Sequence, residues 1–171
     1  MKEKLKKLMI ESINSIQEND IYAFSIFLQD IDDDPLQPVI VFGYNTETQF
    51  EGSLNETDEL EARWNYAFWL QNSKFVFGEN DTAWIVEQWM KLHNFIDLSD
   101  DEIDEVVTPA FVKEIIEVVR DIHDEGIIKD KFGRELPILI HELEYYDEIA
   151  KQNREANGQY LPEGFVEFCM G

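Results

Sequence analysis

The chain has 171 residues, of which 44% are hydrophobic and 13% aromatic, and this composition excludes a disordered protein. A chain of this length suits one domain and can bury about 70% of its unfolded surface. Acids number 37 and bases 14, which gives a formal net charge of −23. Such a surface repels nucleic acid and anionic membranes and attracts a basic partner, although solubility alone also accounts for it. We therefore expect no nucleic acid and no membrane among the partners.

The cysteine content and the N-terminal segment indicate a compartment. Cys169 is the single cysteine, so no internal disulfide can form, and a reducing cytoplasm fits this best. The first seven residues include four lysines, but the first twenty contain no long apolar run, and no other stretch is long enough to span a bilayer. We predict a cytoplasmic protein without a signal peptide.

The first half of the chain predicts one helix followed by strands. Apolar residues recur at helical spacing over residues 3–18. Residues 21–28 (IYAFSIFL) and 38–44 (PVIVFGY) are apolar on both faces and rich in β-branched and aromatic residues, which predicts inner strands joined as an antiparallel hairpin. A loop and a short acidic helix are expected over 45–62. Alternation predicts a third strand over 63–70, and NSKFVFGEND predicts another short strand.

The second half is mostly helical. A helix is predicted over 81–95, with Trp84, Ile85, Trp89 and Leu92 sharing one face.

The acid-rich segment 97–107 carries Ser99 and Glu102 at capping-box spacing. Thr108 and Pro109 then predict the start of a separate helix that ends at Gly126. LPILIH predicts a strand, residues 142–157 a helix, and LPEGFVEFCMG a short closing helix. No repeat or linker interrupts the pattern. We therefore predict a single α+β domain over residues 1–171, with an antiparallel sheet of about four to five strands covered by several helices.

Motifs for catalysis or metal binding are scarce. The aspartates of DIDDDP suggest calcium, but an EF-hand loop starting at Asp30 needs Gly and Glu where Pro35 and Val41 stand, so a solvated loop is the better interpretation. His141 with Glu142 and Glu144 is a weak acid–base or metal cluster, and a strand-end histidine before a solvated acidic helix also explains it. The chain contains no HExxH, P-loop or GxSxG motif. We expect no catalytic residue, no metal site and no cofactor.

The segment EARWNYAFWLQN (61–72) is the densest aromatic stretch. Packing on one face of the predicted strand accounts for most of its rings. Trp69 and Trp89 are expected to be partly exposed, and an exposed tryptophan beside acids makes a good binding hot spot. Arg63 is expected to form a structural ion pair.

Short motifs along the chain resemble a known family. They are Tyr22-Ala23-Phe24, Asn45-Thr46-Glu47, Arg63-Trp64 with Trp69, and the tail FGRELPILIHELEYYDEIAKQNREANG. Together they are similar to the bacterial Domain of Unknown Function 4303 (DUF4303) family, although this chain has RWNYAFW where the family pattern has Ser-Pro after RW. The resemblance implies no catalytic residues. Small acidic proteins of this kind, similar in style to the Smi1/Knr4-like group, are suspected to be immunity proteins that block a toxin.

Three functional hypotheses follow. The first is a non-catalytic immunity or adaptor protein that masks a basic partner such as a toxin, with the acids of 30–34 assisting the acids of 97–105. Its predicted contact residues are Asp97, Asp100, Asp101, Glu102, Asp104, Glu105, Trp69 and Trp89. The second is a small hydrolase using His141 with Glu142 or Glu144. The third is a regulatory domain with a small-molecule pocket along Trp64–Trp69. The sequence does not specify an oligomeric state.

Overall fold

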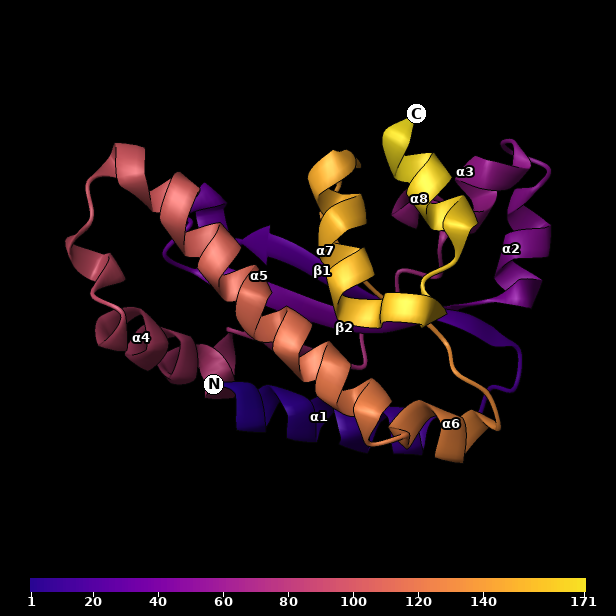
Figure 1. Ribbon diagram of the computed structural model, residues 1–171, viewed down its shortest axis with the longest axis horizontal. Coiled ribbons are helices and arrows are strands. Elements are labelled where there is room, and N and C mark those ends of the chain that lie inside the picture. Colours follow the sequence, from indigo (N-terminus) through magenta and orange to yellow (C-terminus); the bar gives the residue numbers. More distant parts are fainter.

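The protein was analysed as a computed structural model, which describes the backbone of residues 1–171 and all side chains except those of Asp100, Asp101 and Asp104. Over the described backbone, four strands form one mixed sheet in the order β3-β2-β1-β4 (Figure 1). The strands are β1 (Ile21–Asp30), β2 (Pro38–Thr46), β3 (Phe75–Phe77) and β4 (Ile138–His141).

Strand direction corrects the predicted antiparallel sheet. The hairpin of β1 and β2 is antiparallel as predicted, and β3 also pairs antiparallel with β2. However, β4 lies parallel to β1, with Phe24 opposite Ile138 and Phe27 opposite His141. Between β1 and β4 the chain passes through β2, β3 and several helices, and a parallel pair requires a long connection of this kind. The sheet is therefore mixed, and the ends of β1 and β4 lie side by side.

Helices cover both faces of the sheet. One face packs against α1 (Lys2–Ser15), α4 (Ala83–Leu92), α5 (Asp100–Asp124) and α6 (Ile127–Phe132). In Figure 1, α5 crosses in front of the strands. The other face packs against α2 (Glu47–Ser53), α3 (Glu59–Trp64), α7 (Asp147–Asn157) and α8 (Glu163–Met170). None of the helices in the described chain is long and apolar enough to cross a membrane.

The segment predicted as a third strand over 63–70 is not a strand. Asp58 accepts hydrogen bonds from the backbone of Leu60 and Glu61 and so begins α3, which ends at Trp64. Asn65 caps a short 3-10 turn over Tyr66–Phe68 in the same way. These caps set the local structure despite the alternating pattern of aromatic residues. The two tryptophans of the segment pack into the core between the sheet and helices α2, α3, α7 and α8, which we call the second core.

Helix α5 is longer than predicted. Its capping box is confirmed, because Glu102 accepts hydrogen bonds from the backbone and hydroxyl of Ser99. The predicted break at Thr108 is wrong, since the helix continues through Pro109. Val107 before the proline and Phe111 after it are both buried in the same core, and this packing offsets the hydrogen bond that the proline cannot make.

The outer edge of β4 is closed by side chains of α7. Asn157 accepts a hydrogen bond from the backbone of Ile138 and returns one to its carbonyl, at 2.7 and 2.9 Å. Asn153 pairs with the backbone of Ile140 in the same way, at 2.8 and 2.6 Å. Both asparagines are buried. Two amides one helical turn apart thus replace a missing neighbouring strand, and they hold the end of β4 in place.

Candidate functional site

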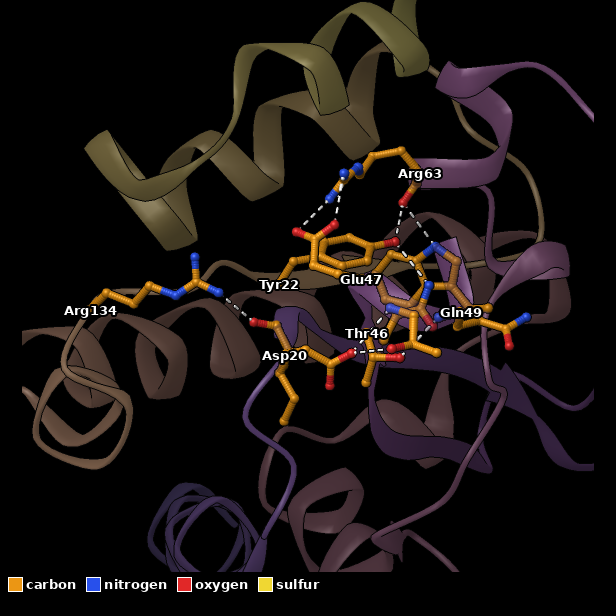
Figure 2. Close-up of polar contacts among 11 residues, drawn as sticks. Asp20, Tyr22, Thr46, Glu47, Gln49, Arg63 and Arg134 are labelled. Atoms are coloured by element: carbon orange, nitrogen blue, oxygen red, sulfur yellow. Dashed lines mark hydrogen bonds and ion pairs between the residues drawn. The ribbon is translucent and has the colours of Figure 1, made fainter. Parts of the chain in front are cut away.

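The family-type motifs converge on one buried junction, shown in Figure 2. The Tyr22 hydroxyl on β1 donates to the backbone carbonyl of Arg63 at the end of α3, at 2.6 Å. Asn45 on β2 donates its amide to the Tyr22 oxygen at 2.9 Å and accepts from the backbone of Leu70. The Trp69 indole donates to the same Arg63 carbonyl at 3.0 Å. Segments far apart in the sequence are therefore tied together here.

The guanidinium of Arg63 completes the junction. It lies 3.7 Å from the ring centroid of Phe50 and 4.5 Å from that of Tyr22, and it pairs with both oxygens of Glu47 at 3.0 Å. An ion pair of Arg63 was expected and is present. Burial raises the pKa of Tyr22 above its usual range, so its hydroxyl keeps its proton and donates. Through these contacts the junction joins β1, β2 and α3.

His141 lies next to this junction, at the end of β4. Its side chain is 1% exposed and surrounded by the rings of Phe27, Tyr66, Trp69 and Tyr145.

Both ring nitrogens of His141 are engaged. Nδ1 lies 3.0 Å from the Glu142 carbonyl, which can only accept, so Nε2 accepts from the Ser25 hydroxyl at 2.7 Å. Burial lowers the pKa of His141 to about 4, so the ring is neutral. A general base needs a nitrogen that a substrate can reach, and this ring has none. The geometry is that of a structural histidine.

A cleft of about 550 Å³ opens beyond His141, where β1 and β4 end together. Its apolar lining comes from Phe27 and Leu28 of β1 and Phe111 of α5. Acidic residues from two separate segments line it as well, and these are Asp30 at the end of β1, Asp33 after it, and Glu142 and Glu144 after β4. Burial and then the charge of Glu144 raise the pKa of Glu142.

These acids were visible in the sequence, but the cleft was not. DIDDDP was expected to be a solvated loop and HELE the start of a solvated helix, with no relation between them. The parallel pairing of β1 with β4 brings them to one edge of the sheet, at the carboxyl ends of parallel strands, where open sheets often bind ligands. No local sequence signal identifies the cleft, because a long connection between two strands permits a parallel pair but also an antiparallel one.

The predicted contact residues are only partly available at the surface. Asp97, Glu102 and Glu105 are exposed, and the Ser99 hydroxyl, then its backbone N–H, lower the pKa of Glu102. The side chains of Asp100, Asp101 and Asp104 lie outside the described residues.

The expected partial exposure of Trp69 and Trp89 is wrong, because each is only 5% exposed. Trp69 is held in the motif junction, and Trp89 packs against Phe95 and Phe111. The exposed tryptophan is Trp84, at 62%. The buried face of α4 therefore differs from the predicted one: Val86 and Met90 lie inside with Trp89, while Trp84 and Leu92 face solvent.

The two remaining sequence hypotheses concern small ligands. Trp64 is buried against Phe165, so the Trp64–Trp69 segment fills the second core. Among the described side chains, no group of three His, Cys, Asp or Glu residues is arranged to hold a metal ion.

Comparison with known families matches residues 1–156 to the family described as "Domain of unknown function (DUF4303)". The chain belongs to this family. The match covers the motif junction and all four strands of the described sheet, and it ends within α7. No curated protein and no solved structure matches the chain. Membership of DUF4303 confirms the family resemblance that the motifs indicated. The family has no described function, so the function must be inferred from the site.

Proposed function

We propose that this DUF4303 protein is a non-catalytic binding protein that masks a basic surface of a partner, as an immunity protein masks a toxin or an adaptor masks its target. One observation carries the proposal: acids of two segments far apart in the sequence, 30–34 and 142–144, lie around one cleft. The backbone of the third acid-rich segment, 97–105, leads into the part of α5 that lines this cleft through Thr108 and Phe111. Figure 1 shows α5 beginning at the end of the molecule where β1 gives way to β2.

The placement of the basic side chains supports the same proposal. Lys2 of α1 pairs with Glu114 and Glu117 of α5, and Lys6 pairs with Asp121 and Glu125. These pairs lie toward the far half of α5, away from the cleft. The acids near the cleft therefore keep a negative field that would speed the encounter with a basic protein. Binding alone would be the mechanism.

The apolar contact residues of the proposed interface must differ from those predicted. Trp69 and Trp89 are buried, so neither can anchor a partner without rearrangement. Leu143, which lines the cleft between two acids, is 75% exposed and can supply apolar contact instead.

The cleft volume also supports a second candidate, a regulatory domain that binds a small molecule. A volume of about 550 Å³ lies within the range of small-molecule sites. The hydrolase hypothesis has no such support, because His141 is buried and fully engaged.

Capture of the partner tests the proposal. The tagged full-length protein would be incubated with an extract of its source cells at about 0.05 M and about 0.5 M salt, and retained proteins identified by mass spectrometry. We expect a basic protein that is held at low salt and released at high salt. Retention of no basic protein at either salt would contradict the proposal, and a metabolite screen would then test the small-molecule candidate.

A further inference from the structure

We infer that the cleft at the shared end of β1 and β4 receives an arginine side chain of the protein partner. This inference rests on the proposed function, because it names the chemical group through which the basic partner is held. It also concerns the residues that line the cleft, none of which was among the contact residues predicted from the sequence at 97–105 and at two tryptophans.

The carboxylates around the cleft are the first feature that favours a basic ligand. Within the described residues, no hydrogen bond or cation engages the side chains of Asp33, Glu142 and Glu144. Glu142 is only partly exposed, and both its burial and the charge of Glu144 oppose its ionisation. A cation placed between these groups would relieve their mutual repulsion and stabilise the ionised form of Glu142.

The second feature is the apolar part of the cleft. The uncharged lining includes Phe27, Leu28 and Pro35. Leu143, which stands between Glu142 and Glu144 in the sequence, lines the cleft as well. A hydrated inorganic cation gains nothing from such a surface. A long basic side chain does, because its methylene stem packs on apolar groups while its charged head remains among the carboxylates.

The origin of the carboxylates favours arginine over lysine. The carboxylates come from two separate segments, one that follows β1 and one that follows β4, and both segments line the same cleft. A guanidinium has five donors in a planar fork and can engage more than one carboxylate at once, whereas an ammonium is a compact, strongly hydrated point charge. Charge complementarity and donor geometry therefore both favour arginine.

A short peptide provides the probe. Acetyl-Gly-Arg-Gly-amide would be titrated into the ¹⁵N-labelled full-length protein, with the matching citrulline peptide as an uncharged control of the same shape. We expect saturable shifts of the backbone amides of Gln29, Asp30 and residues 142–144, and binding of the citrulline peptide weaker by about tenfold or more, because charged hydrogen bonds are lost. An absence of shifts at these amides with the arginine peptide overturns the inference.

Charge-neutral variants provide the matched comparison. Asp33→Asn with Glu142→Gln removes two cleft carboxylates at nearly constant shape. Asp147→Asn with Glu148→Gln removes the same charge from exposed positions on α7 that do not line the cleft. We expect the first pair to weaken arginine-peptide binding by about tenfold and the second pair to change it by less than about twofold. Equal effects would show a general charge effect and overturn the inference.

Two further ligands separate the alternatives. Equal binding of a lysine peptide would show that the cleft responds to charge alone, and tighter binding of agmatine, a free guanidinium compound, would assign the site to a small molecule. Either result overturns the inference. Capture of a basic protein whose binding is unaffected by the cleft variants would leave the proposed function standing while this inference fails. Arginine-peptide binding without any captured basic protein would contradict the proposed function, and with it the assignment of the bound arginine to a protein partner.

Discussion

The hydroxyl of Tyr22 shows how one atom can hold three segments together. It donates to the Arg63 carbonyl and accepts from the Asn45 amide, and these partners belong to α3 and β2. Three of the four motif segments that first suggested the DUF4303 family contribute to this junction. The resemblance therefore reports a shared way of joining the sheet to α3, and the side chains at the junction are used in structure.

Replacing Tyr22 with Phe tests how much this junction contributes to the stability of the protein. The buried Asn45 amide would lose its acceptor, so we expect the free energy of unfolding to fall by about 1–2 kcal/mol. Urea unfolding of the two proteins would measure the difference. The matched control is Tyr146→Phe, since Tyr146 is 40% exposed and should tolerate the loss of its hydroxyl. Equal effects of the two substitutions would show that the junction contributes little.

His141 predicts a pH dependence of stability. Burial lowers its pKa from 6.5 to about 4 in the folded protein, so the unfolded chain binds the extra proton first as the pH falls. The contribution of His141 is thus present above pH 6.5 and is lost as the pH falls toward 4. The loss is about 3 kcal/mol at 1.36 kcal/mol for each unit of pKa.

The measurement is urea unfolding between pH 4 and pH 7 for the wild type and for His141→Asn. Carboxylates add their own pH dependence to both proteins, so the comparison is between the two slopes. We expect a shallower slope in the variant, because it lacks the buried neutral imidazole. The same slope in both proteins would show that His141 is not held neutral by burial.

At the scale of elements, the contact between α7 and β4 depends on matched spacing. Residues four apart in a helix are separated by about 6.0 Å along its axis. Residues two apart in a strand are separated by about 6.6 Å. Asn153 and Asn157 can therefore pair with Ile140 and Ile138 on one edge of β4. The edge strand is closed without a further strand, and its end is held beside the cleft.

Replacing Asn153 with Ala should be strongly destabilising for its size. It leaves the buried N–H of Ile140 without its partner, and we expect a loss of about 2–3 kcal/mol in the free energy of unfolding. Glu155→Ala on the exposed face of the same helix is the control, with an expected change within about 0.5 kcal/mol. Thermal or urea unfolding would compare them. A small effect of Asn153→Ala would mean that water or Gln152 replaces the lost bonds.

Elements governed by local signals could be predicted from the sequence. The N-terminal helix, the β1–β2 hairpin and the capping box of α5 all depend on neighbours in the chain, and all are confirmed. Features set by contacts between distant segments could not be predicted. The direction of β4 depends on its pairing with β1 across the helical crossover, and the exposed face of α4 depends on how that helix sits on the core.

The candidate site follows the same division. Each acid of the cleft was visible in DIDDDP or HELE, but only the parallel pairing places the two segments together. The segment RWNYAFW was predicted to be a strand because its aromatics alternate. Two consecutive side-chain caps, from Asp58 and Asn65, make it a helix and a turn instead.

At the scale of the whole molecule, the fold places part of the net charge of −23 around one cleft. Lys2 and Lys6 pair with the later part of α5, while the acids that line the cleft come from the end of β1 and the segments after β1 and β4. The proposed binding protein would therefore approach a basic partner with this end first. Its attraction would extend over roughly a Debye length, about 8 Å at physiological salt.

The most direct test of this account is the rate of association with the captured basic partner, measured by stopped-flow fluorescence over a series of salt concentrations. A variant with the acids of 97–105 replaced by Asn or Gln, except Glu102, which caps α5, is compared with one in which the same number of acids is neutralised on α7 and α8. We predict a wild-type rate that falls steeply with salt, and a slower, less salt-dependent rate for the 97–105 variant only. A rate that is independent of salt and equal in all three proteins would contradict it.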